Sequence, residues 1–159
     1  MTAPPPDPET RLAELGVTLP GLPRPAADYV HWTTTGGLVF TAGQIPLVDG
    51  RLRRAGKLGA ELTTQEGVEE ARAAAINLLA VAKAAAGSLS RIRVAKVTVF
   101  VASEPGFTEQ HLVANGASQL LGAVLGDAGV HARSAVGVSC LPLDSPVEVE
   151  AVLELLGGR

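Results

Sequence analysis

The chain has 159 residues, a length that suits one domain with a sizeable core and is short for two. Hydrophobic residues make up 47% and charged residues 18%, which is typical of a globular protein and excludes a disordered one. The net charge is −3 and aromatic residues are 3%, so the sequence lacks the basic patch and stacking rings of a nucleic-acid surface. The apolar stretches are too short for a membrane span, and we expect neither a nucleic acid nor a membrane as partner.

The N-terminus is predicted to be an appendage of the main domain. Residues 1–6 are rich in proline, have no signal-peptide pattern, and are expected to form a disordered tail. Asp7 and Pro8 have the arrangement of an N-cap followed by proline at the first helical position, which predicts a short helix. A proline-containing surface connector follows. We therefore divide the chain into an N-terminal segment, 1–26, and a single domain, 27–157.

Two short strands joined by a tight turn are predicted next. Residues 29–35 alternate loosely, residues 38–42 form an apolar run, and the two glycines between them favour a hairpin. Gly43 follows the second strand, where the missing side chain lets another backbone or a ligand approach closely. Residues 51–57 then carry four cations, which we interpret as a solvated edge that discourages aggregation.

The middle of the chain alternates helix, strand and helix. Thr63 and Glu66 form a capping-box pattern that predicts a long helix ending at Gly87, with charged residues such as Glu70 outside its apolar stripe. A strand is expected over 93–101. A second amphipathic helix is expected over about 109–125, with these apolar side chains directed inward: Leu112, Val113, Leu120, Leu121 and Val124.

The last two predicted strands carry three charged residues that are candidates for a site: Arg133, Glu148 and Glu150. Arg133 begins an apolar run, the proline-containing stretch 141–146 turns the chain, and residues 147–155 alternate with the period of a strand. Glu148 and Glu150 therefore share one face, about 6.6 Å apart at a rise of about 3.3 Å per residue.

These charges allow two interpretations. An arginine near such a face can clamp a substrate carboxylate in a bidentate manner, and a glutamate can take a proton from water. Alternatively, Arg133, Glu148 and Glu150 form salt bridges at an edge or a subunit contact.

Cys140 is the single cysteine, so the chain can form no internal disulfide and no paired-cysteine metal site. Its place in a strand-like run predicts a small buried side chain. A chain without disulfides and without a signal peptide is expected in the reducing cytoplasm.

The order of elements predicts a mostly mixed sheet with helices on one face. The other face carries threonine, lysine and glutamate together with apolar residues, which is too apolar for full exposure to water. We therefore expect a homo-oligomer that covers this face.

Four stretches together resemble the RidA/YjgF family, whose members are also described as endoribonuclease L-PSP or translation initiation inhibitors. They are TAGQIP at 41–46, the capped alanine-rich helix, KVTVFV at 96–101, and HARSAVGV with the following LP and VEVEAV. The resemblance runs from Tyr29 to Leu155. It implies a chorismate-mutase-like α+β protomer, with two helices packed on one face of a mixed sheet, assembled as a homotrimer with a ligand cleft at each subunit interface.

The resemblance also implies an activity: hydrolysis of reactive 2-imino acids, released by pyridoxal-phosphate enzymes, to 2-oxo acids and ammonia. No cofactor or metal is expected. Residue by residue, Arg133 matches the arginine that pairs with the substrate carboxylate, and Glu148 matches the acid that activates water. The resemblance further assigns substrate-binding positions to Tyr29, Gly43, Asn115 and Pro142.

Two positions depart from the family pattern. Ala42 stands where the motif usually has serine, and Ala135 stands where many deaminase members have cysteine. Two other functions therefore remain open. A binding module would hold a small carboxylate without turnover and would need Arg133 but not Glu148. A ribonuclease would need a base, an acid and phosphate contacts, whereas the histidines, interpreted as surface or packing residues, are scattered over the chain: His31, His111 and His131.

Overall fold

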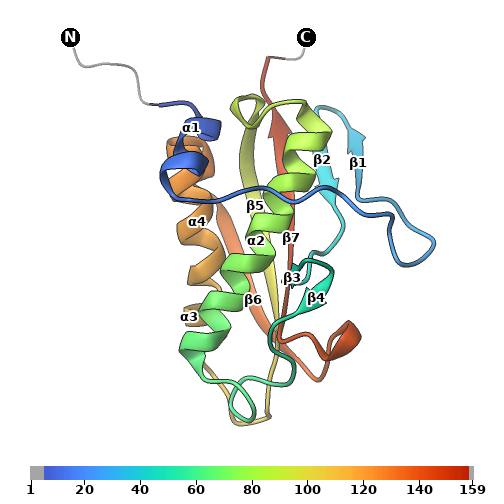
Figure 1. The fold of residues 1–159 in the computed structure, drawn as a ribbon, viewed down its shortest axis with the longest axis vertical. Coiled ribbons are helices and arrows are strands. Elements are labelled where there is room, and N and C mark those ends of the chain that lie inside the picture. Colours follow the sequence, from blue (N-terminus) through green and yellow to red (C-terminus); the bar gives the residue numbers. More distant parts are fainter. Residues whose placement is uncertain (1–5, 158–159) are drawn as a thin grey trace.

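Five strands form a mixed sheet in the order β1-β2-β7-β5-β6, and the helices cover one of its faces (Figure 1). The computed structural model describes residues 6–157. Within the sheet β6 runs parallel to β5, and the other pairings are antiparallel. The predicted α+β class is confirmed. The strands are β1 (Trp32–Thr35), β2 (Leu38–Thr41), β5 (Ile92–Ala102), β6 (Ala132–Val138) and β7 (Val147–Leu155).

The helices and a small second hairpin complete the described chain. The helices are α1 (Pro8–Glu14), α2 (Thr64–Ala86), α3 (Gln110–Val113) and α4 (Asn115–Leu125), and the hairpin strands are β3 (Leu47–Val48) and β4 (Arg51–Leu52). Short 3-10 turns occupy Leu89–Arg91, Gly126–Gly129 and Pro142–Asp144. Within residues 6–157 no helix is both long enough and apolar enough to cross a membrane.

The β1–β2 hairpin confirms the turn prediction. Gly36 and Gly37 have φ angles of +54° and +79°, in the left-handed region that glycine adopts freely. The turn places Thr35 opposite Leu38 and so fixes the register of the two strands.

The capping box predicted for the long helix is present at the start of α2. The Thr63 side chain accepts the Glu66 N–H, while the Glu66 carboxylate accepts the Thr63 N–H at 2.8 Å. Gly87 ends the helix with a φ angle of +80°. The predicted stripe packs into the core between the sheet and the helices, with Val68 half-buried and these residues buried: Ala71, Ala75, Leu78, Leu79 and Ala82.

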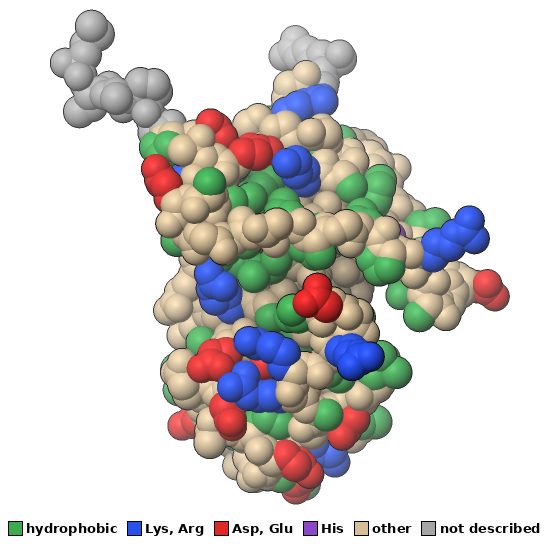
Figure 2. Space-filling model, in the orientation of Figure 1, with side chains coloured by type: hydrophobic (Ala, Val, Ile, Leu, Met, Phe, Trp, Pro, Cys, Tyr) green, Lys and Arg blue, Asp and Glu red, His purple; other side chains and the backbone are tan. Residues whose placement is uncertain are grey.

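Glu70 contradicts the prediction, because its side chain is fully buried in α2. Its Oε1 accepts hydrogen bonds from Arg53 Nη2 at 3.0 Å and from Arg54 Nη1 at 2.7 Å. The segment after β4 folds back onto the helix, so these arginines compensate a buried charge instead of forming a solvated edge. Figure 2 shows positive and negative side chains gathered together on the lower half of this face.

The second predicted helix is divided at Ala114 into α3 and α4. Gly116 lies where α4 crosses α2, and a Cβ there would overlap the Val68 carbonyl group. Leu112 sits on the short α3 and is 38% exposed, so its inward assignment is wrong, whereas the other four predicted residues are buried.

The N-terminal segment packs against the domain. Leu12 of α1 is buried, and the Glu9 carboxylate accepts the Leu89 N–H at 3.2 Å. The connector then crosses the helix layer in front of α2 before it enters β1 (Figure 1). The tail expected over 1–6 lies outside the described residues except for Pro6.

Cys140 is exposed, and the prediction of a buried side chain is wrong. The reason is that β6 ends at Val138, two residues earlier, so Cys140 belongs to the irregular stretch that leads to β7.

Candidate functional site

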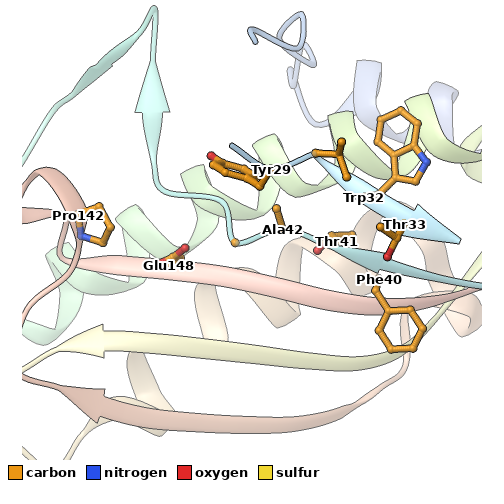
Figure 3. A pocket seen from close by; sticks show the side chains of 10 residues that line it. Tyr29, Trp32, Thr33, Phe40, Thr41, Ala42, Pro142 and Glu148 are labelled. Carbon is orange, nitrogen blue, oxygen red and sulfur yellow. The ribbon is translucent and has the colours of Figure 1, made fainter. Parts of the chain in front are cut away.

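An open hollow of about 600 Å³ lies where β2 ends beside β7 (Figure 3). It brings together four of the residues singled out in the sequence: Tyr29, Gly43, Pro142 and Glu148. We call this group the acid hollow. The remaining lining residues are Val30, Trp32, Thr33, Phe40, Thr41 and Ala42.

Gly43 is required by the position of Glu148. Gln44 and Val149 exchange backbone hydrogen bonds of 2.8 and 2.9 Å, which hold the end of β2 against β7. A Cβ on Gly43 would lie 2.7 Å from Cδ of Glu148. The close approach expected at this glycine is therefore made by the carboxyl group, which lies across the bare backbone.

Asn77 of α2 holds the same segment from the other side. Its Nδ2 donates to the carbonyl oxygens of Ile45 and Leu47, at 2.9 and 3.0 Å. Sequence reasoning missed this role, although an amide side chain among the alanines and leucines of a helix indicates that it has hydrogen-bond partners.

The pKa of Glu148 is raised, first because the carboxyl group is partly buried and then because Glu150 is close. Glu148 pairs with Phe100 and Glu150 with Thr98, so both acids lie on the sheet face opposite the helices. The predicted shared face is confirmed.

Tyr29 lies on a loop at the rim of the hollow and is 50% exposed. The loop is closed by His31, whose Nε2 lies 2.6 Å from the Pro23 carbonyl oxygen. Figure 3 shows the Tyr29 ring extending toward the side where Glu148 and Pro142 lie. Trp32 and Phe40 point to opposite sides of the hairpin, so the aromatic residues do not form one box.

Arg133 lies elsewhere, because it pairs with Val97 on the face of β6 that looks toward the helices. Its Nη1 donates to Asn115 Oδ1 and to Ser118 Oγ, both at 3.0 Å, and its Nη2 donates to the His111 carbonyl oxygen at 2.9 Å. We call these partners the arginine cradle. Asn115, which the resemblance assigns to substrate binding, contacts Arg133, and Ser118 is a partner that sequence reasoning missed, one turn beyond Asn115 on the same helix.

One chain does not bring Arg133 and Glu148 together. Strand β5 lies between β6 and β7, and the two side chains leave the sheet from opposite faces. Strands β6 and β7 follow one another in the sequence but are not neighbours in the sheet. Any site that uses both must take them from two copies of the chain.

The other candidate groups are dispersed. His31 belongs to the Tyr29 loop, whereas the other two histidines lie at the cradle: the His111 carbonyl oxygen accepts from Arg133, and the His131 ring contacts Ser118. Ala42 lines the acid hollow, and Ala135 follows Arg133 on the same face of β6. Across residues 6–157 no group of three or more His, Cys, Asp or Glu side chains is placed to hold a metal ion.

Comparison with known proteins gives one family. Residues 9–155 match the family described as "YjgF/chorismate mutase-like, putative endoribonuclease". Protein TCP17 of Trypanosoma cruzi is 47% identical over 146 residues, which cover 91% of this chain and 91% of that protein.

Two solved structures extend the comparison. Atu1372 of Agrobacterium tumefaciens, a protein with unknown function, is 46% identical with a TM-score of 0.87, over 93% of this chain and 92% of that one. TdcF of E. coli, solved with bound serine, is 29% identical with a TM-score of 0.58, over 86% of this chain and 92% of that one.

Proposed function

The chain belongs to the YjgF/chorismate-mutase-like family, and we propose that it hydrolyses reactive 2-imino acids to 2-oxo acids and ammonia. The site is a cleft between protomers of a homotrimer, in which the acid hollow of one copy faces the arginine cradle of the next.

The observation that carries the proposal is the division of the site into two halves on opposite faces of one sheet. The arginine cradle supplies a cationic group that can bind a carboxylate, and the acid hollow supplies a carboxylate that can accept a proton. Phe40 and Val136 on the face opposite the helices are 41% and 44% exposed, which favours coverage of that face by another copy. A cyclic assembly pairs the two halves once per interface.

Arg133 is suited to bind the substrate carboxylate. A guanidinium has five N–H donors, and three of them are used in the cradle. The Nε–H and one Nη2–H are left. A carboxylate accepts charge-assisted hydrogen bonds from such donors. The serine bound to TdcF carries such a carboxylate, which supports the assignment.

Glu148 is suited to activate water. Its raised pKa makes the carboxylate a stronger base than an ordinary glutamate. It takes one proton from water as the water oxygen attacks C2 of the imine, and the nitrogen accepts a proton from solvent, which gives a tetrahedral intermediate with a hydroxyl and an amino group on C2. Glu148 then passes its proton to the amino group, the C2–N bond breaks to release ammonia, and the hydroxyl loses its proton to solvent as the C2–O bond becomes the carbonyl of the 2-oxo acid. Tyr29, at the rim of the hollow, orients the nitrogen end.

The test is ammonia release from an imine generated in place by an amino acid oxidase, timed with and without the protein. We expect faster release with the parent protein and loss of the acceleration in Glu148→Gln. A parent protein that leaves the uncatalysed rate unchanged would contradict the proposal.

A binding module is the second candidate, and the alanines at 42 and 135 favour it, because they remove a hydroxyl and a thiol from the two half-sites. This function predicts that the parent binds a 2-oxo acid without accelerating imine hydrolysis. It also predicts equal binding in the parent and in Glu148→Gln, since only Arg133 grips the ligand.

A further inference from the structure

We propose that Ser118 and His131 are positioning residues, which hold the Arg133 guanidinium so that its remaining N–H donors face the substrate carboxylate. This inference rests on the proposed function, because it deepens the role given to Arg133. Ser118 was not singled out in the sequence, and His131 was interpreted as a surface or packing residue, but Ser118 contacts Arg133 and His131 contacts Ser118.

The hydrogen on the His131 ring can be placed from its contacts. Nδ1 lies 2.6 Å from the Gly129 carbonyl oxygen, which can only accept, so Nδ1 must carry the hydrogen. In the neutral ring Nε2 is then an acceptor, and it lies 2.9 Å from Ser118 Oγ. The Ser118 hydroxyl therefore donates to His131.

This assignment fixes the direction of the whole chain of bonds. Because the Ser118 hydroxyl donates its hydrogen bond to His131, Ser118 Oγ accepts a hydrogen bond from Arg133 Nη1 at 3.0 Å. The hydroxyl cannot rotate toward Arg133 without breaking its bond to His131. The relay thus runs from Arg133 through Ser118 and His131 to the Gly129 carbonyl, with every donor facing an acceptor.

The end of the relay is rigid. Gly129 is buried against α4, and a Cβ there would lie 2.8 Å from the carbonyl carbon of Leu121. The carbonyl that orients His131 is therefore fixed by backbone packing.

The relay and the other cradle partners together hold both Nη atoms of the guanidinium. Asn115 shares Nη1 with Ser118, and the His111 carbonyl accepts from Nη2. Two acceptors on Nη1 and one on Nη2 fix the orientation of the group and leave the Nε–H and one Nη2–H without a partner among these cradle contacts. Without Ser118 the group keeps one acceptor on each Nη and can rock about the line between them.

The experiment uses the full chain with four variants. Ser118→Ala and His131→Phe each interrupt the relay, Ser118→Thr keeps the hydroxyl, and Gln119→Ala changes the exposed neighbour on the same helix as a control. Two properties are measured: the affinity for 2-oxobutanoate by calorimetry, and the Arg133 side-chain N–H signals by NMR without ligand.

We expect Ser118→Ala to bind 2-oxobutanoate roughly tenfold more weakly, as for loss of one well-placed hydrogen bond to a charged group. Its Arg133 signals, resolved in the parent, should broaden. Ser118→Thr should restore both properties, and Gln119→Ala should match the parent. His131→Phe should weaken binding in the same direction as Ser118→Ala.

The inference is overturned if either property of Ser118→Ala stays at the parent value, because a merely structural serine would not link ligand affinity to the mobility of Arg133. A folded parent that shows resolved Arg133 signals but binds no 2-oxo acid overturns the proposed function instead, and the two failures are thereby distinguished.

Discussion

The acid hollow and the arginine cradle hold their charged groups in opposite ways. Arg133 donates three hydrogen bonds to acceptors in the α3–α4 region, and these hold its side chain. The Glu148 carboxylate has no hydrogen-bond partner among the described residues and is placed instead by its contact with the backbone at Gly43. The difference fits the chemistry proposed for each. Arg133 keeps its charge throughout, so it benefits from a fixed orientation. Glu148 must gain and lose a proton, so it benefits from carboxylate oxygens that are free of hydrogen bonds within the chain.

Removing the proton acceptor is expected to have the largest effect. Glu148→Gln keeps the shape of the side chain but cannot take a proton, so kcat should fall by roughly 10²–10⁴-fold. Binding of 2-oxobutanoate should change little. Steady-state ammonia release and calorimetry measure the two quantities, and an unchanged kcat would remove Glu148 from the mechanism.

Replacing the fixed cation is expected to act mainly on binding. Arg133→Lys retains the positive charge but loses the bidentate edge and most of the cradle, so affinity for the 2-oxo acid should fall by about 100-fold. The same variant should raise KM more than it lowers kcat. Equal affinity in Arg133→Lys and the parent would show that a simple charge is enough.

Filling the gap under the carboxylate should disturb the acid hollow alone. In Gly43→Ala the added methyl overlaps the Glu148 carboxyl group and forces it to move. We expect about tenfold lower activity and a loss of about 1–3 kcal/mol in the free energy of unfolding, as for an overpacked site. Arg133 NMR signals should stay as in the parent, and their change would mean that the two halves are not independent.

The smallest change concerns the pH profile. Hydrolysis requires unprotonated Glu148, so activity should rise with pH through the pKa of this group, which burial and the nearby Glu150 raise from its ordinary value. Glu150→Gln removes the nearby negative charge, lowers the pKa of Glu148, and should shift this limb to lower pH. If the rising limb of the kcat–pH profile moved to higher pH in Glu150→Gln, or did not move, the coupling of the two acids would be excluded.

Much of the fold could be predicted because it depends on local patterns. The alternation over 147–155 coincides with β7, and the capping box at Thr63 coincides with the start of α2. The errors arose where tertiary contacts decide. Glu70 is buried because two arginines come from a segment that is remote in sequence, and Leu112 is exposed because its helix is interrupted.

The site itself could be predicted only as a set of residues. Resemblance selected the members of both halves, and the geometry of one chain groups them as Tyr29, Gly43, Pro142 and Glu148 on one side and Arg133 with Asn115 on the other. The insertion of β5 between β6 and β7 is a non-local pairing that no period or spacing reveals. For the same reason the cradle role of Ser118 became visible only in three dimensions.

The central claim is that the two halves act across an interface between copies, and complementation tests it most directly. Arg133→Lys and Glu148→Gln proteins are unfolded together in equal amounts and refolded as mixed assemblies, and activity is measured at a substrate concentration well below the parent KM, where each variant alone has little activity. If each site takes its cradle from one copy and its acid from the next, random mixing in a trimer leaves about one quarter of the sites with both residues intact. We expect recovery of about one quarter of the parent activity, whereas activity no higher than that of the separately refolded variants would show that the two halves do not meet between copies.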